Sequence, residues 1–308
     1  MPSASARALM AGAVDYAGLF PPAQLPLADA LAEYRRALAG ADAWMLGRFI
    51  VPAVQLPALA DAVVRDAYDG RGWTVSAIVR EHVDEDAAAV QAFNQRAANQ
   101  HVRVDTIECR PSSSSGQGSS DGITWLAKTF SPAFTVHVEV GVGPTARDDL
   151  RVVARHQLRA KVRTGGLVPD AFPAPASLVA FIESARDVGV PFKATAGLHH
   201  AIRGAYPLSN EIGAQSATMH GFVNLMLATA TVGERLPTTT AAALLTRTDH
   251  AALVFDDERV RWGDVELSID AIGRMREAQC VSFGACSFRE PADEYRRFDR
   301  SHAFAPRG

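Results

Sequence analysis

The sequence predicts an α/β protein in which eight parallel strands and their helices close into a (β/α)8 barrel of the TIM type. Short β-branched apolar runs alternate with longer amphipathic stretches along the 308 residues. Such alternation is typical of a parallel sheet covered by helices. Eight runs of this kind occur, which is the strand number of the barrel. An open dinucleotide-binding sheet would carry a glycine-rich turn after its first strand, whereas this chain has DYAGLFPPA there.

The expected strands are short runs rich in Val, Ile, Phe and Thr, bounded by polar or turn-forming residues. In chain order they cover residues 15–20, 47–53, 73–79, 102–108, 134–140, 159–162, 191–194 and 280–284, and the first is the weakest pattern. Apolar residues at helical spacing predict amphipathic helices between them, at 27–38, 56–67, 84–99, 147–157 and 176–188.

Two segments interrupt the alternation. The stretch RPSSSSGQGSSDG at 110–122 is a Ser/Gly-rich loop that we expect to be flexible. A longer insertion at 201–279 precedes the last strand, with helical patterns at 222–232 and 241–245 and a β-hairpin turning near 256–259. We expect one barrel domain over residues 1–308, in which this insertion forms a lid, a subunit contact or a small subdomain.

Composition excludes several classes of function. The formal net charge is −3 and no basic stripe occurs, which argues against nucleic-acid binding. No segment approaches the roughly 18 apolar residues of a membrane span. The three cysteines have no C-x-x-C spacing, and the first residues lack the apolar core of a signal peptide. We therefore expect a cytoplasmic protein with reduced thiols.

Polar side chains gather on one face of three consecutive strands. Side chains alternate between the two faces of a strand, so His137 and Glu139 share a face in FTVHVEV. Lys161 and Arg163 share a face in RAKVR, and Lys193 lies on the same kind of face in PFKAT. The opposite, apolar faces should meet the outer helices, so these five side chains should point into the barrel.

Three cations inside a barrel need compensation, and Glu139 can supply only part of it. The excess of positive charge indicates an anionic ligand or a lysine held neutral. A lysine beside another cation loses its proton more readily, and a neutral lysine can attack a carbonyl to form a Schiff base. Glu139 or His137 would then move protons at the adjacent carbon. A structural network of ion pairs is the alternative.

Small residues follow these strands and could expose backbone N–H groups to an anion. The turns are TGG at 164–166, TAG at 195–197 and GACS at 284–287. Ordinary turn formation would explain the same glycines. The residues expected to bind substrate or an anion are Arg163, Thr164, Gly165, Gly166, Thr195, Gly197, Gly284 and Ser287.

The order VEVG, AKVRTGG, GVPFKATAG and FGACS resembles the class I deoxyribose-phosphate aldolase barrel over residues 135–200 and 280–288. The resemblance implies that Lys161 is the Schiff-base lysine and Lys193 the second lysine that assists it. It also implies anion-binding turns at Gly165, Gly166, Gly197 and Gly284, and a counterpart for the family's fourth-strand aspartate at Asp105. The implied activity is that of a lyase without a cofactor, acting on a small carbonyl compound, phosphorylated or carboxylated.

Two other functions remain open at this level. His199, His200 and His220, with Glu139, could bind a divalent metal for lyase or hydrolase chemistry. Alternatively, the barrel could bind a ligand or take part in an assembly without catalysis. A homo-oligomer is compatible with each of these functions, and the sequence does not fix the oligomeric state.

Overall fold

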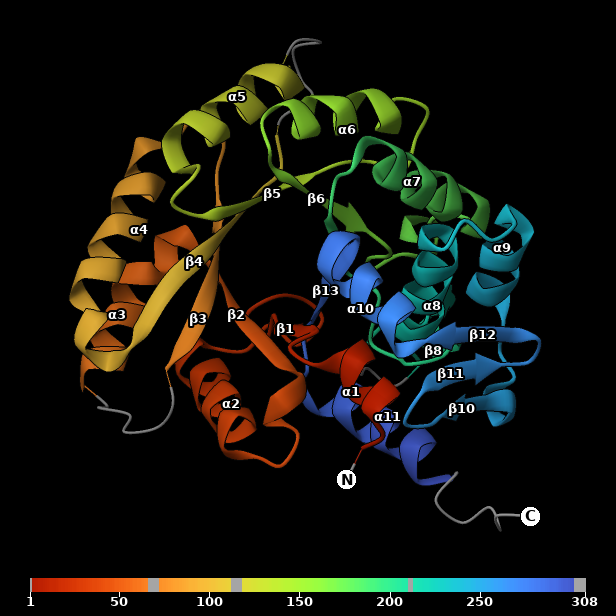
Figure 1. Ribbon diagram of the computed structural model, residues 1–308. Coiled ribbons are helices and arrows are strands. Elements are labelled where there is room, and N and C mark those ends of the chain that lie inside the picture. The colour runs from red at the N-terminus through yellow and green to blue at the C-terminus, as the bar shows by residue number, and fades with distance from the viewer. Residues whose placement is uncertain (1, 66–71, 112–117, 210–212, 302–308) are drawn as a thin grey trace.

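The computed structural model describes residues 2–65, 72–111, 118–209 and 213–301 (Figure 1). Eight parallel strands form a closed barrel in the order β1-β13-β7-β6-β5-β4-β3-β2. The predicted α/β barrel is therefore confirmed. The barrel strands are β1 (Val14–Tyr16), β2 (Leu46–Pro52), β3 (Trp73–Val79), β4 (Val102–Cys109), β5 (Thr135–Glu139), β6 (Arg159–Arg163), β7 (Phe192–Thr195) and β13 (Cys280–Ala285).

The first strand is shorter than expected and ends at Tyr16. The backbone N–H of Phe20 donates to the carbonyl of Ala17, so the chain turns away from the barrel at once. The apolar residues of DYAGLF therefore belong mainly to a loop, which explains why the strand pattern was weak. This loop carries Phe20 to the carboxyl end of the strands.

Helices cover the outside of the barrel. They are α2 (Leu27–Ala39), α3 (Leu56–Arg65), α4 (Asp84–Arg96), α5 (Gly118–Phe130), α6 (Ala146–Arg155), α7 (Pro175–Val188), α8 (Phe222–Gly233) and α11 (Arg289–Ser301). Helix α5 begins inside the segment expected to be a flexible loop, because the small and polar start of the segment leads into the apolar pattern around Ile123 and Leu126. Residues 112–117 of that segment lie outside the described residues.

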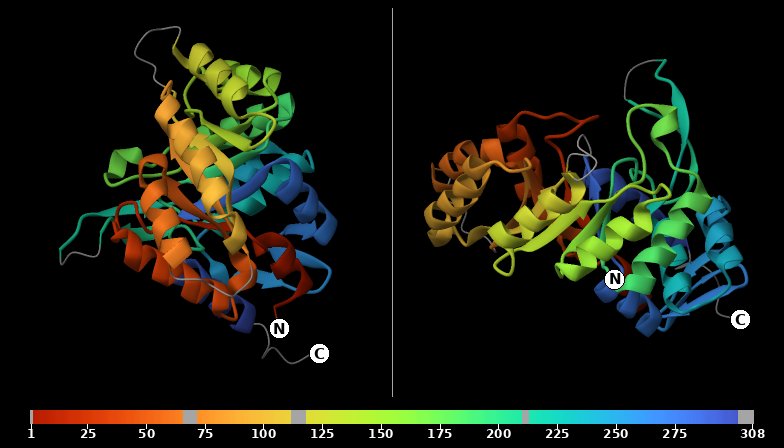
Figure 2. Two further views of the ribbon diagram at one scale, coloured as in Figure 1. Left: turned by 90° about the vertical axis from the view of Figure 1, so that its left-hand side faces the viewer. Right: turned by 90° about the horizontal axis from the view of Figure 1, so that it is seen from above.

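The insertion before the last strand adds two small antiparallel sheets. Strands β8 (Gly204–Pro207) and β9 (Ser216–Met219) pair as one, and β10 (Leu253–Phe255), β11 (Arg259–Trp262) and β12 (Val265–Ser268) form the other. The second sheet exceeds the expected hairpin by one strand, because Gly263 adopts a positive φ of 62° and turns the chain again. The β8–β9 hairpin projects from the body of the protein (Figure 2).

The remaining helices lie partly in the insertion and partly elsewhere in the chain. They are α1 (Ala4–Met10), α9 (Thr238–Thr246), α10 (Ile269–Ala278) and the short 3-10 helices η1 (Ala43–Met45), η2 (Ala53–Gln55), η3 (Ala98–Gln100), η4 (Pro169–Ala171) and η5 (His250–Ala252). Every residue of α8 from Phe222 to Val232 is buried. A helix that is apolar on all sides needs neighbours around it, and α8 has the barrel on one side and α9 and α10 on the other.

The core lies mainly between the barrel and its helices. Val136 and Val138 of β5 and Ala160 and Val162 of β6 are buried there, and their exposed fractions do not exceed 2%. The polar residues that alternate with them point to the barrel axis. Within the described ranges, no helix is long and apolar enough to cross a membrane.

Candidate active site

A buried ion cluster lies inside the barrel around Lys193 of β7. Its side chain is 1% exposed, and its Nζ lies 2.6 Å from Oδ2 of Asp15 and 2.7 Å from Oε1 of Glu108. Asp15 comes from β1 and Glu108 from β4, so the three residues reach the axis from different sides of the barrel. A charge buried so deeply is tolerated only when it is paired and hydrogen-bonded.

Hydroxyl and backbone donors complete the cluster. Ser282 donates to Oδ2 of Asp15 over 2.8 Å, and the backbone N–H of Arg48 donates to Oδ1 over 2.8 Å. Ser76 donates to Oε1 of Glu108 over 2.7 Å. Both carboxylates are therefore held in fixed positions by contacts from several strands.

The charges of the cluster stabilise one another. Burial acts to raise the pKa of Asp15 and of Glu108, but nearby cations and hydrogen bonds together outweigh it, chiefly those of Lys193, with Arg48 at Asp15 and Lys161 at Glu108, so both pKa values lie below their ordinary range. Burial acts to lower the pKa of Lys193, but the two carboxylates outweigh it and raise this pKa. Lys193 is therefore an ammonium and both acids are carboxylates over the neutral pH range.

Lys161 of β6 lies beside this cluster but has looser contacts. In the strand register it pairs with Glu139 on one side and with Lys193 on the other. Its Nζ lies 3.5 Å from Oε2 of Glu108 and 3.3 Å from Oε2 of Glu139. Glu108 therefore contacts both lysines, one through each carboxylate oxygen.

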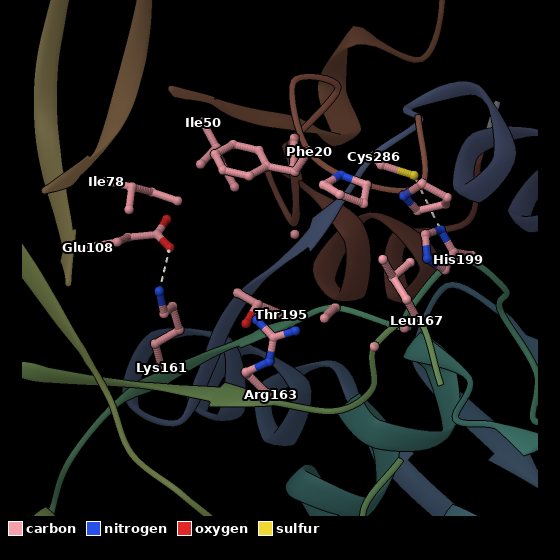
Figure 3. A pocket seen from close by; sticks show the side chains of 17 residues that line it. Phe20, Ile50, Ile78, Glu108, Lys161, Arg163, Leu167, Thr195, His199 and Cys286 are labelled. Carbon is pink, nitrogen blue, oxygen red and sulfur yellow. Dashed lines mark hydrogen bonds and ion pairs between the residues drawn. The ribbon is translucent and has the colours of Figure 1, made fainter. Parts of the chain in front are cut away.

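A cavity of about 230 Å³ opens above Lys161 at the carboxyl ends of the strands. Lys161 and Glu108 lie at its deep end and point toward each other (Figure 3). Lys193 does not line the cavity. The remaining lining residues are Ala17, Phe20, Pro21, Pro22, Ile50, Ile78, Arg163, Gly166, Leu167, Thr195, Ala196, Gly197, His199, Gly284 and Cys286.

Glu139 and His137, the other two residues expected to be catalytic, lie outside this cavity and in different places. Glu139 is half-buried and lines an adjoining hollow, where its second oxygen, Oε1, lies 3.3 Å from Arg110. His137 is buried, and its Nδ1 is 3.1 Å from the carbonyl of Ala160, to which it donates. Burial lowers the pKa of His137 to about 3, and Lys193 acts in the same direction, so this ring is neutral. His137 does not line the cavity.

The expected anion-binding residues divide into two groups. Arg163, Gly166, Thr195, Gly197 and Gly284 line the cavity. Thr164, Gly165 and Ser287 do not, and each has a contact within the protein.

Thr164 and Gly165 join the loops after β6 and β7. The hydroxyl of Thr164 donates to the carbonyl of Ala196 over 2.6 Å. A Cβ placed on Gly165 would lie 2.4 Å from the ring of Phe172 and 2.9 Å from Cα of Gly197. The glycine therefore permits two loops to approach each other.

Ser287 lies at the start of α11. Its hydroxyl accepts from the backbone N–H of Glu290 over 3.2 Å, as in a helix N-cap. It lines a neighbouring hollow together with Glu290, His199 and His200.

The structure does not bring together the four residues considered as metal ligands. His199 lies at the cavity rim, with Nδ1 3.5 Å from Sγ of Cys286. The Nδ1 of His200 donates to Oε1 of Glu294 over 2.6 Å, and the Nε2 of His220 donates to the carbonyl of Pro173 over 2.8 Å. Among the described residues, no group of three or more His, Cys, Asp or Glu side chains is arranged to hold a metal ion.

Two expectations from the sequence need correction. Asp105 is not the fourth-strand acid of the cluster: it pairs with Arg48 at 2.7 Å, and the β3–β4 register shifts at this point, so that Val75 pairs with Val104 but Ser76 pairs with Thr106. Glu108 takes that place instead. The expected excess of positive charge is also absent from the buried cluster, where Asp15, Glu108 and Glu139 face two lysines, whereas Arg163 lies apart at the cavity wall.

One signal in the sequence could have identified Glu108. It is the last charged residue of its strand, and catalytic residues of barrels lie at the carboxyl ends of strands. A second signal is the rarity of lysine. Only three of the 31 basic residues are lysines, and two of these are the barrel lysines.

Comparison with models of known protein families found no match, and comparison with curated proteins found none. Among solved structures, the chain is similar to the tetrameric deoxyribose phosphate aldolase from Aeropyrum pernix, at 13% identity and a TM-score of 0.40 over 63% of this chain and 80% of that one. It is also similar to the spore cortex-lytic enzyme SleL of Bacillus megaterium, at 11% identity and a TM-score of 0.35, over 78% of this chain and 61% of that one. Both similarities concern the fold alone, and the first repeats the distant resemblance seen in the sequence.

Proposed function

We propose that this protein is a class I aldolase-like lyase that acts on a small carbonyl compound through a Schiff base on Lys161. The observation that carries the proposal is the position of the Lys161 amine. It lies at the deep end of a cavity, 3.5 Å from Glu108 and 3.3 Å from Glu139, with a second lysine buried behind Glu108.

Lys193 supports this role by engaging Glu108. It binds Oε1 of Glu108 at 2.7 Å, as does Ser76, which leaves Lys161 a longer contact with Oε2. The amine that lines the cavity is that of Lys161, and a Schiff base forms on a lysine amine. Lys193 is thus a positioning residue and Lys161 the nucleophile.

The proposed bond changes start at the Lys161 amine, which lies beside two carboxylates. The Lys161 amine attacks the substrate carbonyl, and loss of water gives a protonated imine. A carboxylate removes the proton of the β-hydroxyl group, the Cα–Cβ bond breaks, and its electron pair moves toward the imine nitrogen to give an enamine. The aldehyde fragment leaves, the enamine takes a proton at Cα, and water releases the second carbonyl product.

We assign these proton transfers to Glu108 and Glu139, whose oxygens lie nearest to the reacting amine. His137 lines neither the cavity nor the adjoining hollow, and its Nδ1 donates to the carbonyl of Ala160, so we assign no transfer to it. Arg163 and Thr195, at the cavity wall, would bind the rest of the substrate. A cytoplasmic location remains a prediction from the sequence, and a homo-oligomeric state remains compatible with it.

Hydrogen exchange at the substrate α-carbon tests the proposal, because the enamine takes up a proton from solvent. Pyruvate, acetone and acetaldehyde are incubated with the protein in D2O, and deuterium at the α-carbon is followed by NMR. We expect exchange with the wild-type protein and none above background with Lys161→Arg, which keeps the charge but cannot form the imine.

Lys128→Arg is the matched control, because Lys128 is the remaining lysine and is exposed on α5. It should exchange at the wild-type rate. Wild-type exchange that persists in Lys161→Arg would contradict the proposal, as would the absence of exchange with every donor. Circular dichroism establishes that each variant is folded.

A further inference from the structure

The cavity above Lys161 has two chemically different walls. Phe20, Ile50 and Ile78 come from the β1 loop, β2 and β3, and they lie on the opposite side of the cavity from Arg163 (Figure 3). Leu167 adds an apolar side chain at the rim, where it is 54% exposed, and the neighbouring Val168 is 58% exposed. Exposed apolar side chains around a cavity are typical of a ligand-binding surface.

The volume of the cavity suits an apolar ring or a branched chain. A dry cavity of about 150 Å³ lined by Leu, Ile and Phe side chains holds benzene in another protein. The cavity here measures about 230 Å³, which leaves space for a carbonyl group and a short polar end beside such a ring.

Arg163 supplies the charge at the cavity wall. It is exposed, and it forms no ion pair in the part of the chain that the structure describes. Arg110, on the neighbouring rim, differs because it pairs with Glu139. An unpaired guanidinium beside a cavity is suited to a planar carboxylate, with which it can form two parallel hydrogen bonds.

Part of the turns that would cradle a phosphate is engaged in contacts within the protein. The backbone N–H of Thr164 donates to the carbonyl of Thr195 over 2.9 Å. Gly165 is packed against Phe172 and Gly197. Glu290 lines the same hollow as Ser287, together with His199 and His200, so a phosphate bound at Ser287 would lie near a carboxylate.

We propose that the substrate is an unphosphorylated carbonyl compound that carries an apolar ring or chain and a single carboxylate. The apolar part packs against Phe20, Ile50 and Ile78, and the carboxylate binds Arg163 while the carbonyl carbon reaches Lys161. This inference rests on the proposed Schiff-base function and adds the chemical class of the substrate to it.

Four probes separate the two walls. Phenylpyruvate has a ring and a carboxylate, phenylacetaldehyde has only the ring, pyruvate has only the carboxylate, and glyceraldehyde 3-phosphate has a phosphate and no apolar part. For each probe the concentration that gives half-maximal borohydride trapping at Lys161 is measured by mass spectrometry. We expect the lowest value for phenylpyruvate and the highest for glyceraldehyde 3-phosphate.

Substitutions in the charged wall and in the apolar wall should change the half-trapping concentrations of different probes. Arg163→Gln should raise the half-trapping concentration about tenfold for phenylpyruvate and pyruvate, and much less for phenylacetaldehyde. Phe20→Ala, in a loop, and Ile78→Thr, in a strand, should raise it about tenfold for the two phenyl probes and much less for pyruvate. Arg155→Gln, at an exposed position on α6, is the control and should change no value.

The outcomes separate the two proposals. If no probe is trapped at Lys161, the Schiff-base function fails and the substrate class fails with it. If trapping occurs but glyceraldehyde 3-phosphate half-saturates at the lowest concentration, the substrate class is wrong and the function stands. The substrate class is also wrong, with the function intact, if the wall variants affect all four probes equally.

Discussion

Lys193 Nζ and Glu108 Oε1 lie 2.7 Å apart, and each side chain is 1% exposed. This ion pair joins β7 to β4 across the barrel. The other carboxylate oxygen of Glu108, Oε2, faces Lys161. The pair therefore links the stability of the barrel interior to the chemistry of the cavity. Substitution of Lys193 or of Glu108 should therefore affect both the stability of the fold and the chemistry of the cavity.

Removing the buried ammonium should destabilise the fold. Lys193→Met leaves the carboxylates of Asp15 and Glu108 buried without their cation, and loss of one partner of a buried ion pair costs about 3–5 kcal/mol. We expect a loss of this size in the free energy of unfolding measured with urea. Lys128→Met, at an exposed site, should change it by less than about 0.5 kcal/mol. Equal stabilities of the two variants would refute the structural role of Lys193.

Glu108 and Asp105 offer a direct comparison of two acids on one strand. Glu108 lines the cavity, whereas Asp105 binds Arg48 at 2.7 Å. Glu108→Gln should slow α-proton exchange by about 10²-fold or more, which is the size of a general acid–base contribution. Asp105→Asn should leave the rate nearly unchanged. A larger loss in Asp105→Asn than in Glu108→Gln would show that the wrong acid has been assigned.

Acid should begin to destabilise the protein near pH 6.5. The pKa of His137 falls from 6.5 in the unfolded chain to about 3 in the folded one, chiefly through burial. Between these values the unfolded chain binds a proton that the folded protein does not, so the free energy of unfolding decreases as the pH falls. His199, with a pKa lowered to about 4, acts in the same direction.

His137→Asn should therefore reduce the pH dependence of the free energy of unfolding without removing it, because His199 still contributes. The free energy of unfolding is measured with urea at pH 7, 6 and 5. Asp15 and Glu108 contribute little in this range, because their lowered pKa values reduce stability mainly below the unfolded values of 3.8 and 4.5. Identical slopes for the wild-type protein and His137→Asn would contradict the prediction.

Gly165 should tolerate no side chain, because the loops after β6 and β7 meet there. A Cβ would lie 2.4 Å from Phe172 and 2.9 Å from Gly197. Gly165→Ala should lower stability by about 1–3 kcal/mol, which is typical of overpacking. Gly143→Ala is the matched control, since nothing lies within 4 Å of its Cβ position. Thermal unfolding of both variants measures the difference, and equal midpoints would count against the loop contact.

Much of the barrel could be predicted because each strand is a local pattern. The runs at 73–79 and 102–108 match β3 and β4 to within one residue. Helix α5 was not predicted, because its start is a Ser/Gly-rich stretch whose helical conformation depends on packing against the barrel. The length of β1 also depends on its neighbours, since three residues suffice when strands flank both sides.

Side-chain alternation along the strands predicts that Lys161 and Lys193 both point into the barrel. The β6–β7 register pairs these two residues directly. The partners of Lys193 could not be predicted in this way. Asp15 is 178 residues distant in the chain, and an irregularity in the β4 register at Asp105 alters which residues of that strand point inward. The charge state of a buried lysine depends on such partners, so it requires the three-dimensional structure.

The covalent bond to Lys161 is the central claim, and its most direct test uses the fact that the chain has only three lysines. The protein is reduced with borohydride in the presence of phenylpyruvate or pyruvate, digested, and mapped by mass spectrometry. The account predicts a reduced adduct on the peptide that contains Lys161, with Lys128 and Lys193 unmodified. An adduct confined to Lys128 or to the terminal amine, or no adduct with any carbonyl probe, would contradict it.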